Sequence, residues 1–215
     1  MNHRVQGDTV SGMLGIQPIF MTESTIDKRQ LRALLRHKRR NLDPTSQRMA
    51  AQQISTLSQT LHEWADARRI GVYWPTNDEI DTSDISQACR AQGKHLYLPV
   101  VGDNKTLTFA QWISGGPLSN NRFDIPEPVT DTPHCMPANL DIVFLPLVGW
   151  DQSGNRLGMG AGYYDRALKG ISGPLLVGLG YAAQEVSTIP ADSWDIALDK
   201  VITEKGVRHC IMRGD

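Results

Sequence analysis

The N-terminal third of the chain carries apolar residues at the spacing of two helices. Leu31, Leu34 and Leu35 repeat at helical intervals and predict a helix over about residues 26–41. Asp43, followed directly by a proline, supplies an N-cap for a second helix, whose apolar stripe continues to about residue 65. The second helix has one apolar face, so we expect it to pack on the core.

Beyond residue 69 the pattern changes to short apolar runs separated by turn residues. The run Ile70 to Trp74, stopped by a proline, predicts a buried strand, and a helix capped by Thr82 or Ser83 follows it as far as Gly93. Further strands are predicted at 95–98, 107–110, 142–145 and 175–179, with a helix at 163–169. Strands that alternate with helices favour an α/β fold with a mainly parallel central sheet, covered on both faces.

The chain is predicted to form one domain after a short extension. Residues 1–22 carry few charges and no regular apolar period, so we expect a flexible N-terminal extension. The remaining residues, 23–215, are of a suitable length for a single α/β domain. A segment rich in proline, glycine and asparagine, residues 115–139, is interpreted as an ordered excursion within that domain.

Composition limits the possible partners. The 22 Lys and Arg residues nearly balance the 23 Asp and Glu residues, so no overall field attracts nucleic acid or an anionic membrane, and neither is expected as a partner. The three cysteines form no C-x-x-C pair and the histidines no metal-binding pair, which argues against a disulfide framework or a zinc site. With no membrane-spanning run and no signal-peptide pattern, we expect a cytoplasmic protein, and a monomer.

The densest chemical signal is a glycine-rich loop between the 142–145 strand and the 163–169 helix. Its alternate glycines allow a ligand to approach the backbone, and amides at a helix start attract an anion such as phosphate. Arg156 could add a two-pronged phosphate contact, and Asp165 could hold hydrated Mg²⁺. A tight turn in which Arg156 and Asp165 are paired or solvated fits the spacing equally well. The patterns of a P-loop and of a Rossmann dinucleotide site do not fit.

The first predicted helix concentrates positive charge. Seven of the 22 basic residues fall within its thirteen positions 28–40, and Lys28, Arg32 and Arg36 share one helical face. These side chains could clamp a polyphosphate. A solvated basic face is the ordinary alternative, and RNA binding is a third, which the neutral overall charge disfavours.

Acidic residues follow the first strand and recur near the C-terminus. Asp78, Glu79 and Asp81 lie at the carboxyl end of the 70–74 strand, where ligands bind in open α/β sheets, and could accept hydrogen bonds from an aminopyrimidine ring. Helix capping is the competing explanation. Asp195 and Asp199 could serve a metal or be solvated.

Taken in order, these signals resemble the 5-formyltetrahydrofolate cyclo-ligase family, also called 5,10-methenyltetrahydrofolate synthetases. The resemblance extends over about residues 26–207. Its motifs are Lys28-Arg-Gln-Leu-Arg32, Asp78-Glu-Ile-Asp81-Thr82, Asn121-Arg-Phe-Asp-Ile-Pro-Glu127-Pro128, Pro146-Leu-Val-Gly-Trp-Asp151, the run Gly154 to Asp165, and Asp195 with Asp199. It implies a three-layer α/β/α sandwich that uses ATP, with Mg²⁺, to convert 5-formyltetrahydrofolate into 5,10-methenyltetrahydrofolate, ADP and phosphate.

The resemblance also implies roles for individual residues. Arg156 is the implied catalytic residue, Asp165 and Asp195 the Mg²⁺ ligands. The folate-binding residues would be Thr76, Glu79 and Asp81. The implied ATP-binding residues are Lys28, Arg29, Gln30, Leu31, Arg32, Arg156, Leu157, Gly158, Met159, Gly160, Ala161, Gly162, Tyr163 and Tyr164.

Two positions depart from the family pattern. Family members often carry Lys or Gly at the position of Ala161, and a His commonly stands at the position of Trp194. The alternative functions are a sugar-phosphate isomerase of related architecture, which needs no ATP, and a non-catalytic nucleotide- or RNA-binding relative.

Overall fold

The computed structural model describes residues 27–129 and 131–210, so the predicted extension over residues 1–22 lies outside the described residues. The division into an extension and a single domain over 23–215 stays a prediction. The helices are α1 (Lys28–Arg40), α2 (Pro44–Ser58), α3 (Ser83–Ala91) and α4 (Tyr163–Leu168). The strands of the main sheet are β1 (Arg69–Gly71), β2 (His95–Val101), β3 (Leu107–Gln111), β6 (His134–Cys135), β7 (Ile142–Pro146), β10 (Leu175–Leu179), β11 (Lys200–Thr203) and β12 (Gly206–His209). Two hairpins stand apart from it, β4 (Leu118–Asn120) with β5 (Pro126–Pro128) and β8 (Gly149–Trp150) with β9 (Arg156–Leu157).

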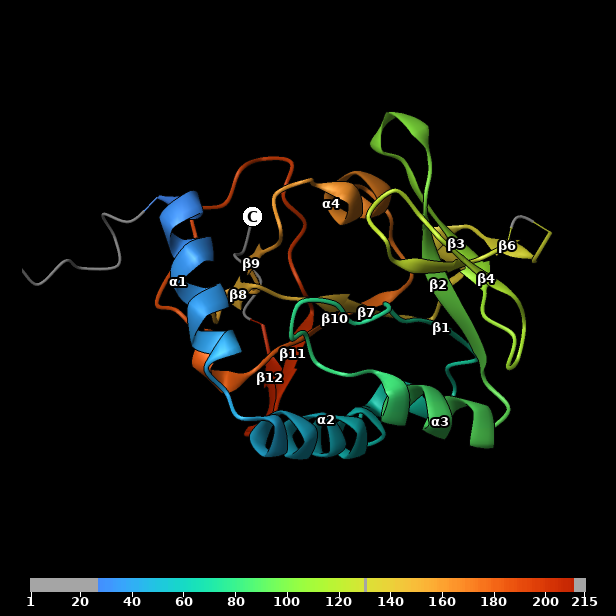
Figure 1. Ribbon diagram of the computed structural model, residues 1–215, viewed down its shortest axis with the longest axis horizontal. Coiled ribbons are helices and arrows are strands. Elements are labelled where there is room, and N and C mark those ends of the chain that lie inside the picture. The colour runs from blue at the N-terminus through green and yellow to red at the C-terminus, as the bar shows by residue number, and fades with distance from the viewer. Residues whose placement is uncertain (1–26, 130, 211–215) are drawn as a thin grey trace, which may run out of the picture.

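Within the described residues the main sheet has eight strands in the order β12-β11-β10-β7-β1-β2-β3-β6 (Figure 1). The five strands from β11 to β2 are parallel, which confirms the predicted mainly parallel sheet. At both edges of the sheet the strands pair in antiparallel fashion, β12 with β11 at one edge and β3 with β2 and β6 at the other, and this was not predicted. The reason is local: β2 reaches β3, and β11 reaches β12, through short turns with no crossover helix, and such turns can join only antiparallel strands.

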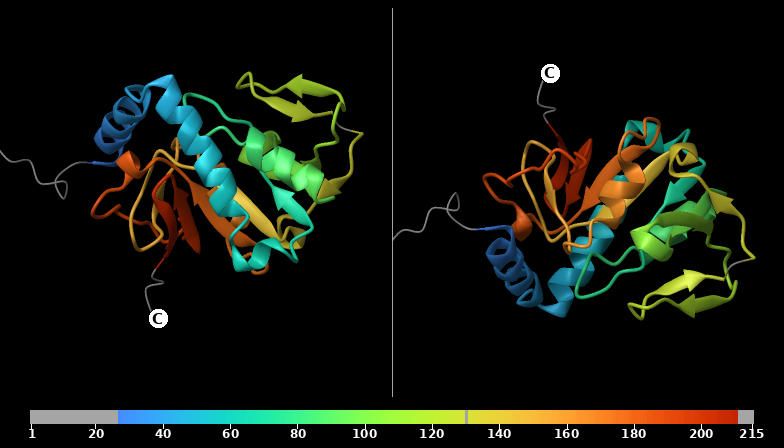
Figure 2. Two further views of the ribbon diagram at one scale, coloured as in Figure 1. Left: turned by 90° about the horizontal axis from the view of Figure 1, so that it is seen from below. Right: turned by 90° about the horizontal axis from the view of Figure 1, so that it is seen from above.

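Helices cover both faces of the sheet, as the α/β/α prediction requires. In Figure 2, α2 and α3 lie across one face in the view from below, and α4 lies on the other face in the view from above. The largest core cluster joins α2 and α3 to the central strands, and a second cluster includes Leu168 of α4. The helix α1 stands at the side and packs Leu31 and Leu35 against the β8–β9 hairpin and the chain near Ile189. No helix in the described ranges is long and apolar enough to cross a membrane.

Helix and strand ends differ from the predicted ones for identifiable reasons. The helix α1 is capped by Asp27, whose side chain accepts from the Gln30 amide, so the helix begins at Lys28 and not at about residue 26. The helix α2 ends at Ser58, and the apolar stripe continues in a separate 3-10 turn, His62–Trp64. The Thr82 hydroxyl donates to the Tyr73 carbonyl at 2.9 Å and does not cap α3.

Arg39 shows that the basic helix is not uniformly solvated. Its side chain is buried and donates to the Leu147 carbonyl at 3.1 Å and the Asn77 carbonyl at 2.6 Å. Desolvation by burial lowers its pKa, against the opposing charges of Glu79 and Asp78. Arg39 therefore fastens α1 to the loops that follow β7 and β1.

We expect Arg39→Met to destabilise the fold by about 2–4 kcal/mol, because two buried carbonyls lose charge-assisted hydrogen bonds. For a domain of this size that lowers the melting temperature by roughly 5–15 °C. Lys38→Met is the matched control, since Lys38 is exposed on the same helix. Equal melting temperatures for the two variants contradict the anchoring role.

Candidate functional site

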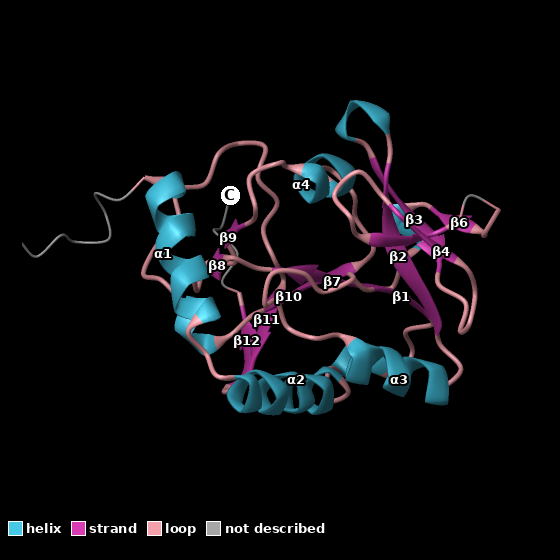
Figure 3. Ribbon diagram, viewed as in Figure 1, coloured by secondary structure: helices cyan, strands magenta, loops and turns pink. Residues whose placement is uncertain are grey.

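A cavity of about 910 Å³ lies at the carboxyl ends of the parallel strands. Its floor includes residues that follow β1 and β7, Thr76 and Leu147 among them, and its walls come from α1, the loop before α4, and the turns after β2 and β4. In Figure 3 these walls are mostly loops and turns, apart from α1 and α4. The cavity is therefore built where the sequence predicted ligand-binding residues to gather.

The glycine loop lies against α1. The Arg32 Nε donates to the Gly158 carbonyl at 2.9 Å, and a Cβ on Gly160 would stand 3.5 Å from the Arg32 Cζ. Gly160 and Gly162 have φ of 103° and 69°, a backbone conformation that favours glycine. Because α4 has only six residues, its dipole contributes little, and side chains supply most of the positive charge beside this loop.

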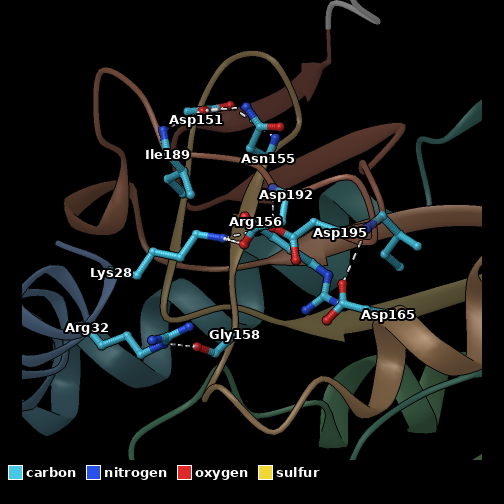
Figure 4. Close-up of polar contacts among 11 residues, drawn as sticks. Lys28, Arg32, Asp151, Asn155, Arg156, Gly158, Asp165, Ile189, Asp192 and Asp195 are labelled. Atoms are coloured by element: carbon cyan, nitrogen blue, oxygen red, sulfur yellow. Dashed lines mark hydrogen bonds and ion pairs between the residues drawn. The ribbon is translucent and has the colours of Figure 1, made fainter. Parts of the chain in front are cut away.

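Arg156 and Asp165 form a mostly buried ion pair in the cavity. The Arg156 Nη2 lies 2.6 Å from the Asp165 Oδ1, with side-chain exposures of 5% and 17%. The same Oδ1 accepts from the Ile196 amide at 3.3 Å (Figure 4). The buried Nε of Arg156 has no hydrogen-bond acceptor among the described residues, and an unmet buried donor costs free energy. Arg156 thus has a buried donor that no described residue satisfies.

Lys28 bridges two carboxylates from the other end of the chain. Its Nζ lies 2.7 Å from Asp192 and 2.9 Å from Asp195, and the Asp192 amide donates to the same Asp195 Oδ2 (Figure 4). Desolvation acts to lower the pKa of Lys28, but the bonds and charges of both aspartates outweigh it and leave that pKa raised. Desolvation acts to raise the pKa of Asp195, but the hydrogen bonds from the Asp192 amide and Lys28 outweigh this effect, so the pKa of Asp195 is lowered. Asp192 was not among the predicted site residues.

Asp151 holds the two segments of this site together. Its Oδ1 accepts from the amides of Ser153 and Asn155, and its Oδ2 accepts from the Asn155 side chain and the Ile189 amide, each within 3.0 Å (Figure 4). The carboxylate is buried and joins the β8–β9 turn to the segment that carries Asp192 and Asp195. In the sequence, Asp151 stands out only as the last residue of a motif.

The residues after β1 form another part of the cavity. Thr76 and Glu79 both line it, and the Glu79 Oε2 accepts from the Thr76 amide at 3.0 Å. Burial raises the pKa of Glu79, against the hydrogen bonds from Thr76 and the charge of Arg39. Asp81 is not among the lining residues, and its Oδ1 accepts from the Ser83 amide at 2.8 Å.

The structure brings together most of the predicted nucleotide and metal residues. Lys28, Arg32, Asp165, Asp195 and the whole run 156–164 line the cavity. Three predicted ATP-binding residues of α1 do not line it. Arg29 is exposed, Gln30 bonds back to the Asp27 cap, and Leu31 is part of the core. The functional roles of all these residues remain predictions.

Asp165 and Asp195 are the two predicted Mg²⁺ ligands. Asp165 and Asp195 are oxygen ligands of the type that Mg²⁺ prefers, and each accepts its bonds on one oxygen, Oδ1 of Asp165 and Oδ2 of Asp195. No group of three or more His, Cys, Asp or Glu suited to a metal occurs in the part of the chain that the structure describes. Two carboxylates beside cationic side chains still fit Mg²⁺, because this ion commonly binds through one or two carboxylates together with substrate phosphates.

Comparison with known proteins decides the family. The family model "5-formyltetrahydrofolate cyclo-ligase family" matches residues 24–204. The chain belongs to this family. A curated 5-formyltetrahydrofolate cyclo-ligase of Haemophilus influenzae is 35% identical over 184 residues, 83% of this chain and 98% of the relative. The one from Escherichia coli K12 is 34% identical over 179 residues, 81% and 98%.

Solved structures of the family have the same fold. The NMR structure of 5,10-methenyltetrahydrofolate synthetase from Aquifex aeolicus superimposes with a TM-score of 0.75 at 32% identity, over 87% of this chain and 94% of that one. The synthetase from Mycoplasma pneumoniae gives 0.68 at 25% identity, over 83% and 99%. These matches confirm the predicted family and fold class.

Proposed function

We propose that this cyclo-ligase family member closes the ring of 5-formyltetrahydrofolate at the expense of ATP. Membership of the family supports this activity, and nothing in the comparisons supports an isomerase or a non-catalytic relative. The assignment of this activity to the cavity rests on one observation. Four side chains line the same cavity: Lys28, Arg32, Arg156 and Glu79. A nucleotide phosphate and a folate ring therefore fit side by side.

The triphosphate binds along the cationic side of the cavity, between α1 and the glycine loop. Lys28 is paired with Asp192 and Asp195, and Arg156 is paired with Asp165. Phosphate oxygens are alternative partners for both cations, and a guanidinium can meet two of them at once. Binding of ATP then exchanges internal ion pairs for contacts with phosphate, so little new charge is buried unpaired.

Asp165 and Asp195 are the residues that would hold Mg²⁺. The ion would supply neutralisation of the phosphate charge that develops during transfer. Both carboxylates lie beside the cations that bind the phosphates, Arg156 and Lys28, so they are suitably placed once those cations turn to the nucleotide.

Glu79 binds and orients the folate. Its desolvated carboxylate accepts hydrogen bonds from the N–H groups of the aminopyrimidine ring. The formyl oxygen then attacks the γ-phosphorus and ADP leaves, which converts a poor electrophile into an iminium-type phosphate. The neighbouring secondary amine nitrogen, which links the pterin to the benzoyl ring, attacks the formyl carbon and loses its proton, and phosphate leaves. No protein nucleophile is needed, and Arg156 stabilises the charge on the transferring phosphoryl group.

One assay tests the whole proposal. Purified protein is mixed with 5-formyltetrahydrofolate and Mg·ATP, and the absorbance of the methenyl product and the release of ADP are followed together. We expect one ADP for each product molecule and no product without ATP. Product formed without ADP contradicts the mechanism, and no product under any condition contradicts the activity.

We expect Lys28→Ala and Arg32→Ala to raise the KM for ATP by roughly tenfold to one hundredfold, because each removes a charged hydrogen-bond donor from the phosphate side of the cavity. Arg29→Ala is the matched control, since Arg29 is an exposed neighbour outside the cavity lining. Steady-state kinetics with varied ATP measures all three. Equal KM values for ATP in the three variants would mean that Lys28 and Arg32 do not bind ATP and belong to a solvated basic face of α1.

A further inference from the structure

The helix α1 extends from the nucleotide side of the cavity to the turn that follows β1. In Figure 1 it runs down one side of the molecule and ends just before α2. Its first turns carry Lys28 and Arg32, which line the cavity on the side assigned to the phosphates. Its last turn carries Arg39, seven positions after Arg32 and therefore on the same face, about 10 Å further along. One helix thus carries the phosphate-binding cations at one end and Arg39 at the other.

Arg39 is hydrogen-bonded to the segment that carries the folate-binding residues. Its Nη2 donates to the Asn77 carbonyl at 2.6 Å, and Asn77 lies between Thr76 and Glu79 in the sequence. Its Nη1 donates to the Leu147 carbonyl at 3.1 Å. Asn77 and Leu147 both line the cavity, whereas Arg39 lies behind them and is not among the lining residues. Arg39 can therefore act on the cavity only through the backbone that it holds.

The segment 76–79 is a tight turn in an uncommon conformation. Asn77 and Asp78 have φ of 51° and 61°, and two consecutive residues other than glycine are rarely found in the left-handed region. The Glu79 amide closes the turn by donating to the Thr76 carbonyl at 3.0 Å. Such a conformation persists only where surrounding contacts hold it, and the bond from Arg39 to Asn77 is one of these contacts. The placement of the Glu79 carboxylate therefore depends on Arg39.

Arg39 also sets a positive charge against Glu79. Burial raises the pKa of Glu79, and the hydrogen bonds from Thr76 and the charge of Arg39 act against this rise. The phenols of Tyr73 and Tyr164 face Glu79 as well; burial raises the pKa of both, and the charge of Glu79 adds to the effect. A buried carboxylate stays ionised more readily beside a cation, and the ionised form is the better acceptor for the N–H groups of an aminopyrimidine ring.

We propose that Arg39 is a positioning residue that aligns the folate-binding turn 76–79 with the nucleotide-binding helix, so that each substrate binds more tightly when the other is bound. The inference rests on the proposed function, because it takes the phosphates to lie along α1 and the folate ring at Glu79. ATP that holds α1 also holds Arg39, and with it the Asn77 carbonyl. The turn then already has the conformation that the folate ring requires. By thermodynamic linkage, folate strengthens the binding of ATP by the same factor.

The experiment measures the dissociation constant of each substrate by calorimetry, with and without the other. The ligands are a non-hydrolysable ATP analogue with Mg²⁺, and 5-formyltetrahydrofolate. Arg39→Met removes both hydrogen bonds and the charge, and Arg39→Lys keeps the charge but cannot reproduce the planar pair of donors. The control is Lys94→Met. Lys94 is another buried cation, outside the cavity lining, whose Nζ donates to the carbonyls of Trp64 and Ala67 at 2.6 and 2.8 Å.

For the wild type we expect each substrate to lower the dissociation constant of the other by about tenfold. This factor should fall to about threefold in Arg39→Lys and below about twofold in Arg39→Met. The dissociation constant of the ATP analogue alone should stay within about twofold of the wild type in both variants, because Lys28 and Arg32 remain. Lys94→Met should lower the melting temperature as Arg39→Met does, since each loses two buried charged hydrogen bonds, but it should keep the wild-type factor. If Arg39→Met does not fold, Arg39→Lys decides the question.

Three results overturn the proposal. The first is a wild type in which neither substrate changes the affinity for the other, and the second is a wild-type factor in the Arg39 variants. The third is loss of the factor in Lys94→Met, which would make the coupling a consequence of stability alone. A wild type that shows the coupling but forms no methenyl product with ATP contradicts the proposed function alone. A wild type that does not bind 5-formyltetrahydrofolate contradicts the proposed function and, with it, the coupling.

Discussion

Replacement of Arg156 by lysine is expected to lower kcat by about one hundredfold, although the charge is retained. The guanidinium reaches Asp165 with one nitrogen, its Nε has no acceptor among the described residues, and the residue lines the cavity. A lysine supplies one compact ammonium group and cannot reproduce this planar set of donors. Loss of a positioned donor that stabilises developing charge typically costs two to three powers of ten in rate, on the order of the effect expected here.

The measurement is steady-state kinetics for ATP and folate, with a melting curve for each variant. Arg166→Lys is the comparison, because Arg166 bonds to carbonyls at the edge of the same loop and is not assigned to the phosphoryl group. A near-wild-type kcat in Arg156→Lys would mean that the glycine loop is only a tight turn with an internal ion pair.

Replacement of Asp165 by asparagine is expected to raise the Mg²⁺ concentration needed for half-maximal activity by at least about tenfold. Asparagine keeps the shape and one acceptor oxygen but removes the negative charge that a Mg²⁺ ligand supplies. The defect should be partly relieved at high Mg²⁺. Titration of activity with Mg²⁺ at saturating ATP measures it.

In Asp165→Asn, the activity lost through lower stability must be separated from the activity lost through weaker Mg²⁺ binding. Asp165 neutralises the mostly buried Arg156, so some loss of melting temperature is expected, and loss of a buried partner can cost several kcal/mol. Asp141→Asn provides the comparison. The Asp141 carboxylate accepts hydrogen bonds from the amides of Arg68 and Arg69, at the ends of the strands opposite to the cavity. If added Mg²⁺ does not help Asp165→Asn, and the lost activity follows the lost stability, Asp165 is only a structural partner of Arg156.

Much of the fold follows from local sequence. The stripe through Leu31 and Leu35 and the proline-initiated second helix needed only helical spacing and caps, and both helices are present. The central strands were found because they are buried on both faces and read as continuous apolar runs. The hairpins β4–β5 and β8–β9 were missed, since strands of two or three residues carry too few positions for an alternating pattern.

Site residues were predictable where they fall within one motif. The glycine loop and Lys28 with Arg32 are contiguous or one helical turn apart, and the structure lines the cavity with them. Asp192 could not be found in this way, because its partner Lys28 is 164 positions distant and only the folded chain joins them. Conversely, Arg29 and Asp81 belong to motifs, yet helix geometry turns Arg29 outward and the start of α3 engages Asp81.

The ion pairs of Lys28 with Asp192 and Asp195 also affect how the protein folds during synthesis. The ribosome releases Lys28 well before its acidic partners, which lie 164 and 167 positions further on, so this side of the cavity stays incomplete until Asp192 and Asp195 have emerged. Joining positions so far apart costs loop-closure entropy, and this places the contact late in folding. During synthesis the helix exposes cations with no native carboxylates to meet them. A chain truncated before Asp192 is therefore expected to bind polyanions loosely through this helix, and selective binding of ATP is expected only when Asp192 and Asp195 are present.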